Sequence, residues 1–360
     1  MADTSTHVRH ERLQAFILDC LVAMKMPRAA AETSAGLMVR TDLRGVESHG
    51  IDMLPRYWEL WRDGVIEMDA EPLVVRDDGA TALLDGRKGL GHPVSARAMQ
   101  LAIDKARTYG IGIAAVRNSN HFGAAANYSM MALAHDLIGF ATTNTPYVAM
   151  VPTFGRAAKL GTNPISFAAP AGDEPPFVLD MATTTVAFGK IRVASRWEKP
   201  IPEGWALDER GMPTTDPFVA LKARLLTPVG GSRETGGHKG YGLAVMVDIL
   251  SGVLGGAVYG DLYFRSDMAE RKIGNVGHCF AAIDPARFRE IGEFKRDMDD
   301  MIRSLKATPP ADGQTRVLVA GEPEAAAART RTASGIPISP GLAAQIARVA
   351  DDLGVPPLLI

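Results

Sequence analysis

The sequence predicts an α/β fold, in which a centre of strands and helices is flanked by a helical N-terminal region. Two observations support this class. Apolar residues recur at helical spacing over residues 8–26, and a second helical pattern runs from about Arg28 to Leu43. From about residue 73 onward, short runs of β-branched and apolar residues alternate with helical patterns, which is typical of a sheet covered by helices.

Residues that typically begin or end helices lie in both the N-terminal and the C-terminal parts of the chain. Pro27 ends the first helix, and a third helix is expected over Leu54–Asp63, before Gly64. The last helix has Ser339 as a cap, Pro340 in its first turn and Gly354 after its last periodic residue.

The centre alternates between the two patterns. Strands are expected over residues 73–75, 82–84, 111–116, 138–142, 165–168, 177–179, 280–283 and 316–319. Helices are expected over residues 94–109, 124–136, 241–254 and 285–305. Residues 196–217 are rich in Pro, Gly and charge and should form a surface loop, and residues 258–277 an irregular excursion.

Composition narrows the function classes. Of 360 residues, 46% are apolar and 22% charged, and the net charge of −2 comes from interspersed charges. This pattern argues against nucleic acid and anionic membrane as partners. The sequence also predicts no signal peptide and no membrane span. Cys20 and Cys279 both lie in apolar patterns, so we expect buried free thiols and a cytoplasmic protein.

One apparent nucleotide motif is excluded by its context. Residues 110–115, Gly-Ile-Gly-Ile-Ala-Ala, match a loose dinucleotide fingerprint, but the helix precedes the glycines and the strand follows them. The fingerprint needs the opposite order, so that a helix N-terminus faces the pyrophosphate. Gly110 is therefore predicted to end a helix. A phosphate loop of the Walker type and the spacing of a zinc site are also missing from the sequence, so no metal is expected.

Five short signatures carry polar or reactive side chains, and four of them also contain glycine. They are Arg-Gly-Val-Glu-Ser-His-Gly (44–50), Ser-Asn-His-Phe-Gly (119–123), Leu-Gly-Thr-Asn-Pro-Ile (160–165), Leu-Asp-Met-Ala-Thr (179–183) and Gly-His-Lys-Gly-Tyr-Gly-Leu (237–243). Glycine lets backbone and ligand approach closely beside a titratable group. Together the five signatures predict one assembled active site.

Each signature has a functional and a structural interpretation. His49 suits a general acid or base oriented by Ser48, or it caps a helix end through a backbone bond. His121 suits a contact to cofactor or substrate, although Asn120 alone also explains a turn. Asp180 suits an acceptor for a ribose hydroxyl or an imidazole, or, as a structural residue, the cap of a turn. Lys239 suits an anion contact, or it is a solvated lysine in a loop. His135 and His278 are predicted to be structural, and His92 is left open.

Together, the five signatures resemble the malate/L-lactate dehydrogenase family, which has a non-Rossmann NAD(P) fold, and the likeness extends from about residue 8 to 355. The resemblance implies a mixed-sheet cofactor-binding domain over residues 76–334. It also implies a helical substrate-side and dimerisation region over residues 1–75, with residues 335–360 packing back on it. The implied enzyme is a homodimer that moves hydride between NAD or NADP and a small 2-hydroxy or 2-keto acid.

The resemblance also implies residue roles. His49, with Ser48 as relay, and His121 compete as the principal acid or base, and Asp180 joins the catalytic group. The implied substrate-binding residues are Arg44, Met53, Arg56 and Thr162. The implied cofactor contacts are His121, Asn144, Asn163, Asp180, Met181, Ala182, Lys239, Gly321 and Glu322.

One position departs from the pattern. Many members carry Arg four residues after this histidine, where a guanidinium grips a carboxylate as a fork. Here that residue is Met53, while Arg56 stays nearby. We hypothesise that Met53 makes the pocket more apolar and shifts preference away from dicarboxylates. The alternative functions are a cyclic imine reductase acting on piperideine- or pyrroline-2-carboxylate, a metal-dependent hydrolase or lyase, and a catalytically silent homologue.

Overall fold

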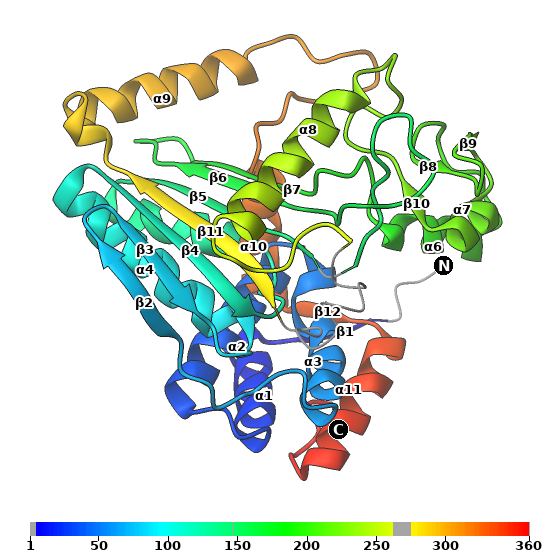
Figure 1. Ribbon diagram of the computed structural model, residues 1–360, viewed down its shortest axis with the longest axis horizontal. Coiled ribbons are helices and arrows are strands. Elements are labelled where there is room, and N and C mark those ends of the chain that lie inside the picture. The colour runs from blue at the N-terminus through cyan, green and yellow to red at the C-terminus, as the bar shows by residue number, and fades with distance from the viewer. Residues whose placement is uncertain (1–4, 146, 262–274, 360) are drawn as a thin grey trace.

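A seven-stranded mixed sheet forms the centre of the computed structural model, which describes residues 5–145, 147–261 and 275–359 (Figure 1). In spatial order its strands are β2 (Leu73–Asp78), β3 (Thr81–Asp85), β4 (Ile111–Ser119), β11 (Val276–Ile283), β5 (Ile138–Thr143), β6 (Ile165–Ala169) and β7 (Phe177–Met181). Only β3 and β4 pair in parallel, joined through a helix; the other neighbours are antiparallel. The predicted mixed α/β class is confirmed.

Helices cover both faces of this sheet. α4 (Gly91–Tyr109) and the short α5 (Ala126–Ser129) contact it on one face, and α8 (Gly237–Asp248) with the π-turn Ile249–Val253 contacts it on the other. Gly110 ends α4 with φ +87°, as predicted, and β4 follows. The glycine pattern therefore runs from helix to strand, and no helix N-terminus faces it.

The N-terminal helices form a second layer beside the sheet. α1 (His10–Ala23), α2 (Arg28–Leu43) and α3 (Leu54–Arg62) pack with the C-terminal α11 (Pro340–Leu353) at the lower side of Figure 1. β1 (Thr6–Val8) pairs antiparallel with β12 (Ile336–Ile338), which brings the C-terminal segment back as predicted.

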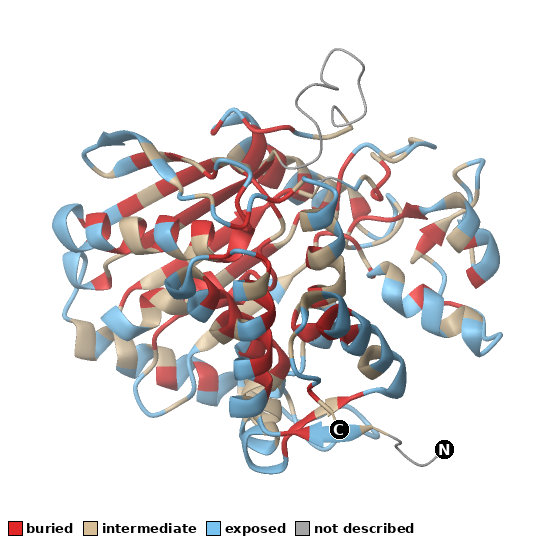
Figure 2. Ribbon diagram, turned by 90° about the horizontal axis from the view of Figure 1, so that it is seen from below, coloured by how far each residue is buried: buried red, intermediate tan, exposed pale blue. Residues whose placement is uncertain are grey.

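Two separate apolar clusters stabilise the two layers. One joins α1, α2, α3 and α11, and the other lies between α4 and the sheet. Figure 2 shows buried residues concentrated in the interior and exposed residues on the outer helices and loops. We propose that the clusters mark two domains close to the bounds predicted from the sequence, with the first boundary before Leu73 because β2 belongs to the sheet. Among the described residues, no helix is long and apolar enough to cross a membrane.

A small lobe extends from the sheet near β7. It contains α6 (Phe188–Arg196), β8 (Ala206–Leu207), β9 (Pro213–Thr214), α7 (Pro217–Ala223) and β10 (Leu225–Leu226). The predicted loop over residues 196–217 therefore carries two short strands. Its core is a third apolar cluster, which includes Ile191, Ile201 and Leu226.

Several predicted elements differ from the structure. The helix expected over residues 124–136 is one turn of α5 followed by a 3-10 helix over Met130–His135, which Asp136 ends in a left-handed conformation. Residues 316–319 form no strand, because no neighbouring strand pairs with them. α9 begins at Ile291 and ends at Lys306, and α10 spans Glu322–Ser334. Most of the excursion expected over residues 258–277 lies outside the described residues.

Candidate active site

Two adjoining cavities lie where the N-terminal helices meet the sheet and the small lobe. The larger, of about 490 Å³, is lined by Ser48, His49, Asp180 and neighbouring segments, and falls within the size range of ligand pockets. The smaller, of about 270 Å³, is lined by residues that include Met53, Arg56 and His121. Thr162 lines both cavities, so they meet at this residue.

The loop that carries His49 is held from behind by a buried carboxyl group. Asp42 of α2 accepts a hydrogen bond of 2.8 Å from the backbone N–H of Ile51. A Cβ at position 50 would lie only 2.0 Å from Asp42 Oδ1, so this turn requires Gly50. Burial raises the pKa of Asp42 to about 7. Asp42 and Gly50 therefore fix the backbone directly after His49.

Arg331 of α10 secures the same loop from the C-terminal part of the chain. Its Nη1 donates to the backbone oxygen of Asp42 at 2.7 Å, and its Nη2 forms an ion pair with Glu47. The Ser-His segment is thus fastened on two sides before any ligand binds.

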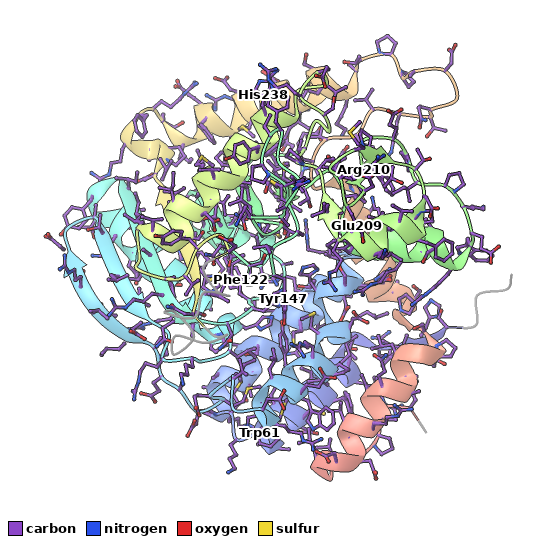
Figure 3. The ribbon with its side chains drawn as sticks, turned by 45° about the vertical axis from the view of Figure 1, so that its right-hand side comes forward. Trp61, Phe122, Tyr147, Glu209, Arg210 and His238 are labelled. Carbon is purple, nitrogen blue, oxygen red and sulfur yellow. The ribbon has the colours of Figure 1, made fainter. Side chains whose placement is uncertain are left out.

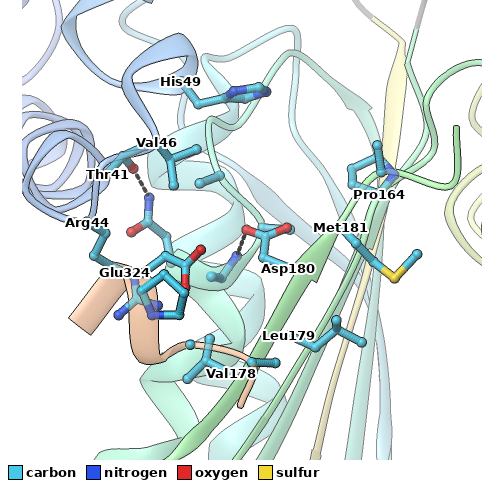
Figure 4. A pocket seen from close by; sticks show the side chains of 18 of the residues that line it. Thr41, Arg44, Val46, His49, Pro164, Val178, Leu179, Asp180, Met181 and Glu324 are labelled. Carbon is cyan, nitrogen blue, oxygen red and sulfur yellow. Dashed lines mark hydrogen bonds between the residues drawn. The ribbon is translucent and has the colours of Figure 1, made fainter. Parts of the chain in front are cut away.

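His49 faces the larger cavity and has a hydroxyl partner. Ser48 Oγ lies 2.8 Å from His49 Nδ1, which leaves Nε2 for a ligand. His49 stands at the top of the cavity in Figure 4, above Asp180. Burial lowers the pKa of His49 below its usual value of 6.5. Its imidazole is therefore neutral and able to accept a proton near neutral pH.

His121 stands beside His49, with a ring-centroid separation of 5.5 Å. The Tyr57 hydroxyl lies 2.7 Å from His121 Nδ1, and the Gly123 N–H donates weakly to the same nitrogen at 3.4 Å. Tyr57 is fully buried, which raises the pKa of its hydroxyl and keeps it protonated. Nδ1 of a neutral His121 therefore accepts both bonds, and the ring hydrogen is on Nε2.

Burial and the surrounding imidazoles lower the pKa of His121 well below its usual value. His92 lies edge-on to Tyr57 with ring centroids 5.6 Å apart, and His278 is bound on both nitrogens by Thr143 and Ser119. The prediction that His278 is structural agrees with these bonds. His121 is thus a neutral hydrogen-bond donor with a fixed orientation.

Asp180 lies at the end of β7, on the floor of the larger cavity. Its Oδ2 accepts a 2.7 Å hydrogen bond from the backbone N–H of Ala126, and Oδ1 keeps its lone pairs for a ligand. Desolvation of its carboxylate by the surrounding protein raises the pKa of Asp180 to about 6. Arg44 and Glu324 stand on the neighbouring wall. This cavity thus offers both a carboxylate and a guanidinium.

Much of the remaining wall of the larger cavity is apolar. This apolar part includes Val178, Leu179, Met181 and Ala182. Gly321 has φ +94°, and a Cβ there would lie 2.9 Å from the Val178 side chain. The wall therefore needs glycine at this position.

The smaller cavity is cationic. Arg56 donates to Glu59 at 2.9 Å and to the Tyr147 hydroxyl at 2.8 Å, and Arg224 reaches the same cavity from the small lobe. Among the described residues that line it, none is acidic, and Leu60, Val148, Phe188 and Val276 add apolar surface. The cavity therefore favours a small anion with an apolar portion.

Four of the expected cofactor residues line neither cavity. Asn144 is buried, donates to Val258 O and accepts from Gly277 N, and Asn163 donates to Ala244 O. Glu322 accepts from Val319 N and pairs with Lys306 at 3.1 Å. Lys239 lies in the first turn of α8, and its neighbour His238 is far from Tyr147 in Figure 3. Arg44, expected to bind substrate, lines the larger cavity.

Sequence analysis missed Asp42, Tyr57, Arg224 and Arg331. Tyr57 lies in α3, which begins only at Leu54, and its hydrogen bond to His121 joins segments that are distant in the sequence, so no local pattern indicated it. The other three come from segments whose proximity depends on the tertiary fold. Within the described part of the chain, no group of three or more His, Cys, Asp or Glu side chains is placed to hold a metal ion.

The arrangement supports proton exchange with an anionic substrate next to a second, larger ligand. The comparisons with known proteins define the class further. The malate/L-lactate dehydrogenase family model matches residues 8–347. Malate dehydrogenase from Pyrococcus horikoshii is 41% identical over 97% of this chain and 96% of its own. L-sulfolactate dehydrogenase from Methanocaldococcus jannaschii is 39% identical, over 97% of each chain.

Solved structures agree with this similarity. Malate dehydrogenase from Entamoeba histolytica superimposes with a TM-score of 0.93 at 31% identity, covering 98% of this chain and 99% of the other. A Δ1-piperideine-2-carboxylate reductase from Pseudomonas syringae pvar. tomato reaches 0.83 at 28% identity, covering 96% and 99%. Fold and site thus define an oxidoreductase that acts on a CH–OH group. The chain belongs to the malate/L-lactate dehydrogenase family.

Proposed function

We propose that this enzyme interconverts a small 2-hydroxy acid and its 2-oxo acid with NAD or NADP as the hydride carrier. The observation that carries the proposal is the position of the His49–His121 pair. The two rings lie 5.5 Å apart, one lining each of two cavities that meet at Thr162. Ligands in the two cavities would meet beside both imidazoles.

The residues of the larger cavity fit a dinucleotide. Asp180 Oδ1 is able to accept a ribose hydroxyl, Arg44 is suited to a phosphate, and Leu179 and Met181 give apolar surface for a flat ring. When bound, the nicotinamide supplies hydride to the substrate carbon or takes it away. Arg44 is thus reassigned from the substrate to the cofactor. Asn144, Asn163 and Glu322 would support the site as structural residues, and Lys239 stays without a role in this proposal.

The two histidines would divide the proton work. In the oxidative direction, His49 Nε2 takes the hydroxyl proton of the substrate, and Nδ1 shares its hydrogen with Ser48 Oγ. His121 donates from Nε2 to the same substrate oxygen and orients it. We therefore assign His49 as the principal acid or base and His121 as a hydrogen-bond donor.

The smaller cavity would hold the substrate. Arg56 would bind the carboxylate next to the reacting carbon, and its bonds to Glu59 and Tyr147 fix its direction. Met53 and Leu60 would pack against the rest of the molecule. A cyclic imine with a carboxylate is the alternative substrate, supported by the structural similarity to the piperideine-2-carboxylate reductase.

A steady-state assay separates these substrates. The purified enzyme is supplied with NADH or NADPH and either pyruvate, oxaloacetate or Δ1-piperideine-2-carboxylate, and nicotinamide absorbance is followed. The proposal predicts turnover on at least one 2-oxo acid with a higher kcat/KM than on the imine. A preference for the imine would replace the main proposal with the alternative, and lack of cofactor binding would contradict both.

We further propose a homodimer in a reducing compartment. Leu243 of α8, Ile249 and Val253 of the π-turn, and Leu254 directly after it are exposed although they are apolar. A second copy of the chain would cover this surface. Cys20 and Cys279 are buried and free, which agrees with the expected cytoplasmic location.

A further inference from the structure

Arg224 is an arginine in a backbone conformation that normally selects glycine. It follows α7 with φ +56° and ψ +36°, the left-handed region in which a helix usually ends on Gly or Asn. A side chain with a Cβ is strained there. Strain of this kind persists where the surrounding structure or a function requires the residue.

The main chain around Arg224 is tied to the wall of the smaller cavity. Its own N–H donates to Ala220 O at 2.9 Å, which closes the end of α7. Two residues later, Leu226 N donates to Ala149 O at 2.8 Å, and Leu226 O accepts from Val151 N at 3.1 Å. Ala149 lines the cavity, so these bonds set the position of Arg224 relative to it.

The side chain of Arg224 is directed by an aromatic ring. Its guanidinium carbon lies 5.7 Å from the ring centroid of Phe188, which lines the same cavity. No carboxylate of the described residues lies within ion-pair distance of Arg224, whereas Arg56 is paired with Glu59. Arg224 is therefore a charged group without an acidic partner at the edge of an anion-binding cavity.

We propose that Arg224 binds the distal anionic group of a doubly charged 2-oxo acid whose first carboxylate is held by Arg56. The distal group is a carboxylate or a sulfonate, since both present oxygens that match a guanidinium fork. This proposal rests on the proposed function and names its substrate class. It also revises the hypothesis about Met53, because the second cation of the cavity comes from the small lobe and not from the segment after His49.

Substrate discrimination tests the proposal. kcat/KM is measured for oxaloacetate, 3-sulfopyruvate and pyruvate with wild type, Arg224→Leu and Arg224→Lys. Arg196→Leu is the matched control, because Arg196 is exposed in the same lobe and lines neither cavity.

For Arg224→Leu we expect a loss in kcat/KM of roughly 10- to 100-fold on both dianions, mainly through KM, and a change within about 3-fold on pyruvate. Arg224→Lys should retain part of the preference. An equal loss on all three substrates, or no loss on either dianion, would overturn the proposal; loss on one dianion alone would support it for that anion and overturn it for the other.

A binding measurement keeps the proposal testable without turnover. Malonate, a dianion without a 2-oxo group, should raise the Tm of wild type and of Arg196→Leu more than acetate does, and this difference should disappear in Arg224→Leu. A malonate effect that persists in Arg224→Leu would overturn the assignment of Arg224. Failure of every 2-oxo acid to turn over, with the malonate difference intact, would instead contradict the proposed reaction.

Discussion

The hydroxyl of Tyr57 gives the most specific prediction about the chemistry. Tyr57→Phe removes the 2.7 Å bond to His121 Nδ1 and leaves that nitrogen only the 3.4 Å contact to Gly123 N. A buried acceptor left without a full partner costs about 1–3 kcal/mol. His121 then loses the preference for hydrogen on Nε2, the nitrogen that donates to the substrate.

The expected effect is a fall in kcat of about 5- to 150-fold, since each 1.4 kcal/mol corresponds to a tenfold change. NADH binding, measured by fluorescence, should stay within about 2-fold because Tyr57 does not line the larger cavity. Tyr109→Phe is the control, because Tyr109 is exposed on α4. Nitrogen-15 NMR of the histidine rings would detect the tautomer directly. An unchanged kcat together with an unchanged tautomer would refute the assignment of His121 as an oriented donor.

Three further predictions follow from the pKa shifts and the loop that holds His49. His49→Ala should lower turnover by at least about 100-fold while cofactor affinity is largely kept; equal loss of both would indicate a structural role. In the oxidative direction the base is neutral imidazole, so with the pKa of His49 lowered, kcat/KM should be retained at pH 6.5 and fall only at lower pH; an acidic limb above 6.5 would contradict this. For Asp42 the folded-state pKa of about 7 lies above the ordinary 3.8, so wild type loses stability as the pH rises between these values. Asp42→Asn should therefore gain unfolding free energy relative to wild type from pH 4 to pH 8, by up to roughly 4 kcal/mol in urea unfolding, and a constant difference would contradict the shift.

The sequence predicted those parts of the fold that depend on local patterns. The helices over Arg28–Leu43 and Pro340–Leu353 follow from apolar spacing and capping signals. The same signals predicted that Gly110 ends α4 and that Gly354 ends α11, both in the left-handed conformation. α5 did not follow, because its apolar sequence suits a longer helix. Pairing of β1 with β12 and insertion of β11 between β4 and β5 join distant segments, which no local pattern encodes.

The site divides in the same way. Ser48, His49 and His121 lie in signatures that contain glycine, and Asp180 ends an apolar strand, so their residue types and settings revealed them. Asp42 and Arg331 act through backbone atoms on the far side of the loop. Arg224 depends on the docking of the small lobe against Ala149. Asn144 and Asn163 look like ligand contacts in sequence, yet their amides bond buried backbone groups.

Transfer of deuterium from the cofactor to the substrate tests the proposed hydride transfer directly. The enzyme is given nicotinamide cofactor that carries deuterium at C4 on either face, in the NADH and NADPH forms, with pyruvate and oxaloacetate, and the products are analysed by mass spectrometry. We expect one deuterium on C2 of the hydroxy acid from one face of the ring, and a greatly slowed reaction in His49→Ala. A hydroxy acid without deuterium from either face, or no product from any combination, would contradict the proposed transfer.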